Sequence, residues 1–214
     1  MSAFFQLLLL VLMLNNLLLA GVVRLASLIR QVAVQGVLLA LLLMLPGAHG
    51  FSLEHLLLGG AVLLIKGIAF PILLSRTLRK VAVEQDAEPR LGCGLSVLAC
   101  MVGLAFSLWL EARLPIQPGL FPSLLLPAAL MTLFSGLILV VGRTKAISQV
   151  IGYLVAENGI FLLGIPLMTE GAVWFELTIL LDVFVAVFVM GIAINHINRT
   201  FESIDVGRFC SLRD

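Results

Sequence analysis

The chain has 214 residues and a formal net charge of +1, and 61% of its residues are hydrophobic while only 12% are charged. Its mean hydropathy is +1.18, whereas an average soluble domain is about 45–50% apolar and about 25% charged. This composition excludes a water-soluble globule, an intrinsically disordered chain and a disulfide-stapled secreted domain. Nothing in the charge balance indicates a nucleic-acid partner. The sequence predicts a protein embedded in membrane lipid.

Seven stretches are apolar enough to cross a membrane, for which a helix needs about 20 mostly apolar residues. Their residue ranges are 3–23, 31–47, 53–75, 91–111, 124–142, 146–167 and 174–197. The breaks between them are short, and a polar tail runs from residue 198 to 214. We predict an all-α, polytopic bundle of about seven transmembrane helices whose loops are too short to hold a folded domain.

Positive charges alternate from break to break. The second and sixth breaks contain no Lys or Arg, and the fourth contains only Arg113. Because cytoplasmic loops carry the excess of Lys and Arg, this pattern predicts the N-terminus outside and the C-terminus in the cytoplasm. The positive residues of the first, third and fifth breaks and of the tail are Arg24, Arg30, Arg76, Arg79, Lys80, Arg90, Arg143, Lys145, Arg199, Arg208 and Arg213.

A cluster of prolines divides the chain. Pro115, Pro118, Pro122 and Pro127 cross the fourth break and the entry to the fifth stretch. Proline interrupts regular helix. We therefore predict a front four-helix region over residues 1–123 and a three-helix region over residues 124–214 that ends in a short cytoplasmic tail.

Polar residues inside the predicted helices are the candidates for function. Asn15 and Asn16 lie in the first helix, where we expect them to face other helices rather than lipid. An ionisable group at the centre of a membrane helix costs about 2.5–3.5 kcal/mol on insertion scales and usually marks a function. Lys66 lies about 20 Å from the outer end of the third helix by helix rise, Glu157 near the middle of the sixth, and Asp182 in the upper half of the seventh.

Two interpretations of Lys66, Glu157 and Asp182 stay open. They are either buried ion pairs that set the helix register, or parts of a proton or cation pathway, because desolvated carboxylates and lysines can exchange protons near neutral pH. Glu54, Glu111 and Glu176 lie nearer the outer helix ends and are weaker candidates.

The surroundings of Lys66 also carry a prediction. Gly59, Gly60 and Gly67 lie close to it in the sequence, and glycines let membrane helices approach closely. Pro71 follows one turn later and is expected to kink the helix.

No motif in the chain predicts a catalytic, metal or cofactor site. Cys93, Cys100 and Cys210 form no CxxC or Cys/His cluster, so an iron–sulfur or zinc site is not expected. The three histidines are dispersed, without the spacing for haem ligation. Phosphate-binding and nucleophile motifs are missing as well.

The stretch from Arg143 to the tail resembles the three-helix K subunit of bacterial complex I, the NADH–quinone oxidoreductase. It has a basic break, a helix with a mid-membrane acid, a second helix with an acid, and a basic exit. Members of that family carry a glutamate in each of two consecutive helices. Glu157 matches the first, and Asp182 matches the second with a side chain one carbon shorter.

The whole chain is more similar still to component E of the membrane arm of hydrogenase-4 and formate hydrogenlyase. The matching segments are LIKGIAFPILL around Lys66 and Pro71, IGYLVAENG around Glu157, and FELTILLDVFVAVFVM around Asp182. The tail FESIDVGRFCSLRD is similar to the short cytoplasmic tails of both families.

The resemblance implies a subunit of a large hetero-oligomeric complex in a bacterial or archaeal cell membrane. The implied partners are antiporter-like membrane subunits, an anchoring subunit like subunit 1 of complex I, and peripheral hydrogenase and iron–sulfur subunits. Iron–sulfur clusters and a nickel–iron site would belong to those partners, and this chain would hold no cofactor. Lys66, Glu157, Asp182 and Glu176 would lie on its proton pathway.

Two other functions stay open. The chain could be a subunit of a multi-subunit cation/proton antiporter, whose C subunit is also K-like, although those chains are generally about half this length. It could also be a scaffold whose charges only specify assembly.

Overall fold

The computed structural model describes residues 3–45, 53–81, 92–114 and 124–165. Within these residues the protein is helical throughout, and six helices are long and apolar enough to cross a membrane. This confirms the predicted all-α membrane bundle and identifies the protein as a multi-pass membrane protein. The seventh predicted stretch, 174–197, lies outside the described residues.

The helices follow one another through short connections. Their bounds are α1 Ala3–Gly21, α2 Leu25–Met44, α3 Leu53–Val62, η1 Leu63–Ala69, α4 Phe70–Val81, α5 Cys93–Arg113, α6 Leu125–Gly142 and α7 Ala146–Gly164. The π-helical segment η1 joins α3 and α4 without a break, so these three form one long helix.

Three predicted helix ends were wrong, and each error placed a charged residue in a break. Arg30 lies inside α2, Arg76 inside α4, and Arg113 inside α5. Arg30 and Arg76 are exposed. Backbone hydrogen bonds continue wherever a charged side chain can extend to water, so an apolar stretch ends earlier than its helix.

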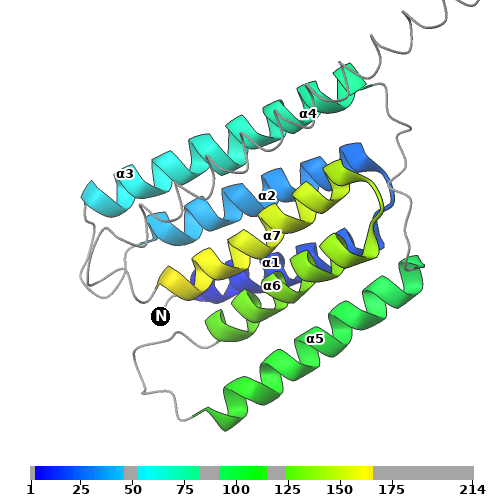
Figure 1. Cartoon of the computed structure of the whole chain (residues 1–214). Helices are drawn as coiled ribbons and strands as arrows, with labels where there is room; N and C mark the ends of the chain where they lie inside the picture. The colour runs from blue at the N-terminus through cyan, green and yellow to red at the C-terminus, as the bar shows by residue number, and fades with distance from the viewer. Residues whose placement is uncertain (1–2, 46–52, 82–91, 115–123, 166–214) are drawn as a thin grey trace, which may run out of the picture.

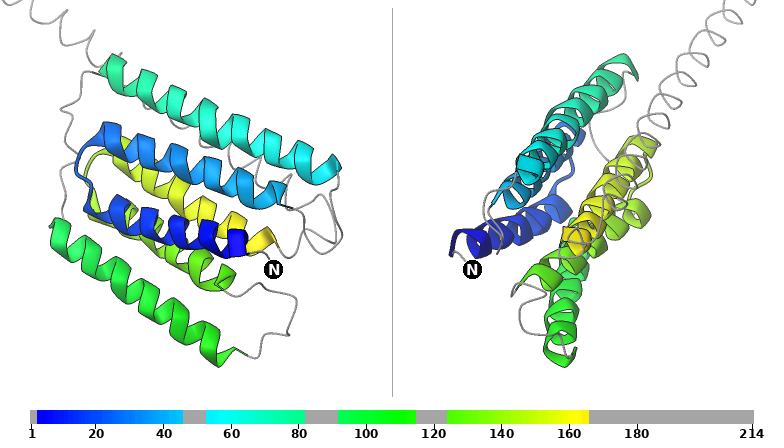
Figure 2. Two further views of the ribbon diagram at one scale, coloured as in Figure 1. Left: turned by 180° about the vertical axis from the view of Figure 1, so that it is seen from behind. Right: turned by 90° about the vertical axis from the view of Figure 1, so that its left-hand side faces the viewer.

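Four helices make the core of the molecule. α6 packs against α7 and α1, and α2 packs against α1 and α7. The long helix α3–η1–α4 lies along α2 on one flank, and α5 lies against α6 on the opposite flank (Figures 1 and 2). The core thus combines helices from both predicted regions, and the division at residue 123 stays a prediction.

The basic connections lie at one end of the bundle. The α1–α2 turn, the end of α4, the start of α5 and the α6–α7 turn come together there (Figure 1). Arg143, which is 2% exposed, donates from Nη2 to the carbonyl oxygen of Val22 at 2.7 Å and so joins two of these connections. Burial lowers the pKa of the Arg143 guanidinium from its ordinary value, and the neighbouring Cys93 opposes this. This grouping agrees with the charge pattern that predicted the topology.

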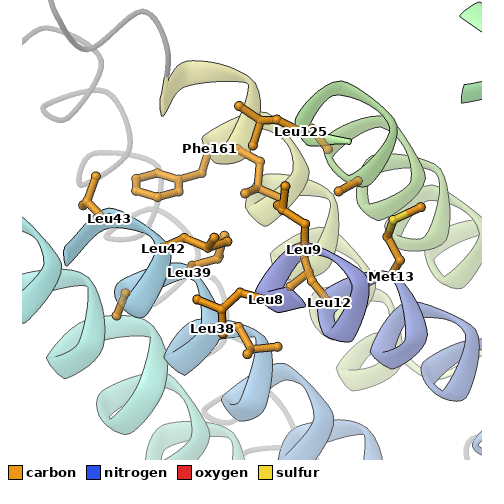
Figure 3. Close-up of a cluster of buried hydrophobic side chains, with 14 of the residues drawn as sticks. Leu8, Leu9, Leu12, Met13, Leu38, Leu39, Leu42, Leu43, Leu125 and Phe161 are labelled. Atoms are coloured by element: carbon orange, nitrogen blue, oxygen red, sulfur yellow. The ribbon is translucent and has the colours of Figure 1, made fainter. Parts of the chain in front are cut away.

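Two apolar clusters fill the core. The first contains the side chains of Leu9, Leu12, Leu39, Leu125 and Phe161 together with their neighbours (Figure 3). The second lies toward the basic end. It includes Leu19, Leu28, Leu139, Ile151 and Leu154. On every core helix, a polar residue lies in the sequence between the members of the two clusters, and these polar residues form the candidate site.

Candidate functional site: a buried ion pair and its polar layer

Lys66 and Glu157 form a direct ion pair in the interior of the bundle. The Lys66 Nζ atom lies 2.6 Å from Glu157 Oε1, and the two side chains are 5% and 2% exposed. They come from η1 and α7, separated by 91 positions in the sequence. Two of the four predicted pathway residues are therefore neighbours. The other two, Asp182 and Glu176, lie outside the described residues.

Lys66 faces inward because of the register of its helix. Val62, Lys66, Phe70 and Leu74 recur every four residues, and all four are buried. The π-helical turn runs from Leu63 to Ala69. Its hydrogen bonds, which span five residues instead of four, continue into Phe70, whose N–H donates to the carbonyl of Ile65.

Pro71 follows this turn directly. A proline ring clashes with the carbonyl four residues before it, and a π-helical turn is one way in which a helix accommodates an interruption. The structure therefore has a π-helical segment just before Pro71, and this segment contains Lys66; the kink itself stays a prediction.

Gly36 of α2 allows the backbone at Lys66 to approach closely. A Cβ atom on Gly36 would lie 2.7 Å from both the carbonyl carbon and the carbonyl oxygen of Lys66. The prediction for Gly59 was correct in kind, since its Cβ would lie 3.2 Å from Ala40 O, but that contact is remote from Lys66. No described atom lies within 4 Å of a Cβ atom added to Gly60, so close packing at Gly60 stays a prediction.

α7 holds Glu157 by packing tightly on α6. A Cβ atom on Gly159 would lie 2.5 Å from the backbone nitrogen of Leu133, and one on Gly152 would lie 2.8 Å from that of Val140. Small residues at this spacing bring membrane helices into backbone contact. Glu157 thus lies on a helix that packs closely against α6.

The ammonium group of Lys66 has further partners. It donates to Asn158 Oδ1 at 3.2 Å, and Nζ lies 5.7 Å from the centre of the Phe161 ring. A carboxylate, an amide oxygen and an aromatic face all favour a positive charge. Together they compensate a charge that the surrounding apolar residues do not solvate.

A chain of hydrogen bonds leads from this pair across the core. Asn158 Nδ2 donates to Gln35 Oε1 at 3.2 Å, Gln35 Nε2 donates to Asn16 Oδ1 at 2.7 Å, and Asn16 Nδ2 donates to Thr132 Oγ1 at 2.7 Å. Asn16, Gln35 and Thr132 are 0% exposed, and Asn158 is 2% exposed. The prediction that Asn15 and Asn16 face other helices is confirmed, since both are buried.

Sequence reasoning missed Gln35, Thr132, Asn158 and Gly36. Gln35 was the easiest to find, because an uncharged amide amid apolar residues of a membrane helix needs an internal partner. Thr132 gives no such signal, since a threonine can satisfy its hydroxyl on its own helix.

Comparison with known proteins finds several that are similar in sequence to this chain. An uncharacterized protein of Mycobacterium tuberculosis is 31% identical over 199 residues, which cover 89% of this chain and 87% of that protein. Hydrogenase-4 component E of Escherichia coli K12 is 27% identical over 166 residues, 76% of each chain. The protein of the same name from Shigella flexneri matches equally. The chain is thus similar to hydrogenase-4 component E over 76% of its length.

This similarity supports the family resemblance inferred from the sequence. No protein-family model matches the chain, and no solved structure matches it. The resemblance of residues 124–214 to subunit K of complex I stays a prediction.

Proposed function

We propose that this chain is a membrane subunit of an energy-converting redox complex of the hydrogenase type, related to group 4 hydrogenases, formate hydrogenlyase and complex I. The similarity to hydrogenase-4 component E of E. coli and the six apolar helices support this proposal. The chain itself would hold no cofactor. Its complex would sit in a bacterial or archaeal cell membrane, with the basic end of the bundle toward the cytoplasm.

The proposed role of the chain in that complex is proton coupling through Lys66 and Glu157. The observation that carries it is the 2.6 Å contact between Nζ and Oε1 of side chains that are 5% and 2% exposed. The pair is removed from water, and this desolvation disfavours the charged forms of both groups. A proton that moves from Nζ to Oε1 converts the ion pair into an amine and a carboxylic acid without changing the net charge.

Such a pair can respond to a charge that arrives in a neighbouring subunit. A second proton taken up by the carboxylate leaves an ammonium beside a carboxylic acid, and its release restores the ion pair. We propose that Glu157 carries the proton and that Lys66 either relays it or sets the charge of Glu157, with Asp182 and Glu176 as further members of the pathway.

A scaffold function is the second candidate. Lys66 and Glu157 compensate each other within this chain, and the hydrogen bonds that follow join α7, α2, α1 and α6. Buried polar groups can specify the register of helices without any transport. In that case the charges would serve only assembly.

Glu157→Gln separates the two candidates, with Glu111→Gln as its matched control. Glu111 accepts a hydrogen bond from the Leu124 backbone N–H at 3.2 Å, outside the polar layer. Inverted membrane vesicles would be supplied with a low-potential electron donor, and hydrogen evolution and proton uptake would be followed together. For the relay, Glu157→Gln leaves the complex assembled on a native gel and lowers the protons moved per hydrogen at least tenfold, while Glu111→Gln behaves as wild type.

Either of two results would overturn the relay. Wild-type proton uptake in Glu157→Gln removes the carboxylate from the pathway. Loss of partner subunits from the native gel, in Glu157→Gln but not in Glu111→Gln, supports the scaffold.

The proposed partners are antiporter-like membrane subunits, an anchoring subunit like subunit 1 of complex I, and peripheral hydrogenase and iron–sulfur subunits. A tagged copy of the chain, extracted in mild detergent, should recover these subunits in mass spectrometry. Recovery of antiporter subunits without any hydrogenase or iron–sulfur subunit would instead assign the chain to a cation/proton antiporter.

A further inference from the structure

The hydrogen bonds beyond Lys66 all run in the same direction. Asn158, Gln35 and Asn16 each accept through the side-chain oxygen from the preceding residue and donate through the amide nitrogen to the next. Every amide oxygen therefore faces toward the Lys66 end of the chain. Since a carboxamide can be turned over to exchange its oxygen and nitrogen, this common direction needs a cause.

The two ends of the chain determine the direction. At one end the ammonium of Lys66 has only donors, so Asn158 must present its oxygen at 3.2 Å. At the other end the Thr132 hydroxyl donates to the Ala128 carbonyl on its own helix at 2.6 Å. Its oxygen is thus left to accept from Asn16 Nδ2.

The amides between these ends have no other orientation that keeps every bond. Turning Gln35 over would place its nitrogen against the nitrogen of Asn158 and its oxygen against the oxygen of Asn16. Both contacts would be repulsive, and Gln35 is 0% exposed, so water could not replace the lost bonds. A buried network of this kind is stable only when all its members are satisfied.

We propose that Asn158, Gln35, Asn16 and Thr132 form a one-directional chain of hydrogen-bonded dipoles that holds Lys66 as an ammonium ion directed at Glu157. The negative end of each dipole points toward Nζ, and hydrogen bonds in series polarise one another in the same sense. Once Lys66 has passed a proton to Glu157, the chain still presents an oxygen to the amine and favours return of the proton. This role rests on the proposed proton relay and concerns the same ion pair.

These four residues act as positioning residues and do not carry protons. Carboxamide and hydroxyl side chains stay neutral in the physiological pH range. Their effect on Lys66 passes through oriented dipoles, and Thr132 influences the lysine only through the three amides between them. The proposal therefore makes Thr132 sensitive to the charge of a residue that it does not contact.

The test is a double-mutant cycle between Thr132 and the ion pair, measured on the full chain in mild detergent. Thr132→Val removes the hydroxyl with little change of shape. Its effect on the thermal midpoint would be compared in the wild-type background and in Lys66→Met/Glu157→Gln, where the ammonium is gone. We expect a loss of about 2–4 °C with Lys66 present and less than half of that loss in the neutral background, where Asn158 no longer has to face an ammonium.

Two variants exclude a purely structural explanation. Thr132→Ser keeps the hydroxyl and should restore the midpoint. Thr77→Val is the matched control, because Thr77 is a buried threonine of α4 whose hydroxyl donates to the Leu73 carbonyl at 3.0 Å. Its substitution should lower the midpoint equally in both backgrounds.

An equal loss for Thr132→Val in the two backgrounds would overturn the proposal, and so would no loss in the wild-type background. If Thr132→Val gives no folded protein, Gln35→Met interrupts the same chain at its middle and is judged by the same comparison. The cycle measures stability and needs no proton transport. A failed relay would appear in the vesicle assay of Glu157→Gln, whereas a failed dipole chain would appear only in this cycle.

Discussion

Lys66→Met tests the ion pair on which the proposed function depends. The Nζ–Oε1 contact is 2.6 Å, and the carboxylate side chain is 2% exposed, so methionine would leave a buried acid without its ammonium. Breaking a buried pair by removing one partner costs about 3–5 kcal/mol. At about 2–4 °C per kcal/mol for a chain of this size, the thermal midpoint should fall by about 6–20 °C.

Removing the second charge should reverse most of that loss. In Lys66→Met/Glu157→Gln neither member of the buried pair carries a charge, and neutral replacement of a whole buried pair is often close to neutral in stability. We expect the double variant to unfold within about 2 kcal/mol of wild type. The assay is thermal unfolding of the full chain in mild detergent at pH 7, followed by the helical circular dichroism signal.

Arg30→Met provides the control for loss of a positive charge. Arg30 is an exposed residue of α2, and surface substitutions usually change stability by less than about 0.5 kcal/mol. A single variant Lys66→Met as stable as Arg30→Met would refute the reasoning. So would a double variant less stable than the single one, since removal of the acid that had lost its Lys66 partner would then bring no gain.

Two further predictions concern packing and the basic end. Gly136→Ala should cost about 1–3 kcal/mol, because its Cβ would overlap the backbone nitrogen of Ala156, whereas Gly60→Ala, with no described atom within 4 Å, should be neutral or slightly stabilising in the same unfolding assay. Equal midpoints for the two would contradict this packing. Arg143→Met removes the 2.7 Å bond to the Val22 carbonyl, worth about 1.5–3 kcal/mol for a charged donor, and should speed hydrogen exchange in the α1–α2 turn. An unchanged exchange rate there would show that the bond does not hold the turn.

Much of the architecture was readable from hydropathy alone. The predicted stretches 124–142 and 146–167 agree with α6, Leu125–Gly142, and α7, Ala146–Gly164, within a few residues. Hydropathy located the helices because lipid demands both apolar side chains and complete backbone hydrogen bonding. It misplaced the start of α2 by six residues, 31 against 25, because an arginine near the membrane surface ends the apolar run without ending the helix.

The sequence predicted only part of the candidate site. Lys66 and Glu157 were identifiable from the sequence, because placing a charged side chain within an apolar membrane helix costs free energy whichever way the side chain points. Their direct contact at 2.6 Å became visible only in the structure, because the two residues lie on helices far apart in the sequence. The glycine that brings α2 onto the Lys66 backbone was missed, because Gly36 lies 30 positions away on another helix.

The sequence by itself determined that this is a helical membrane protein and that a few polar side chains would have to be compensated within it. Both conclusions follow from transfer free energies, which depend on composition along each segment. Only the tertiary structure decided which polar groups meet. Partner choice depends on helix register, on the π-helical turn before Pro71 and on glycine contacts between helices, none of which has a local sequence period. The direction of the amide chain depends on both its ends at once, Lys66 on η1 and Thr132 on α6, and so exists only once the helices are packed.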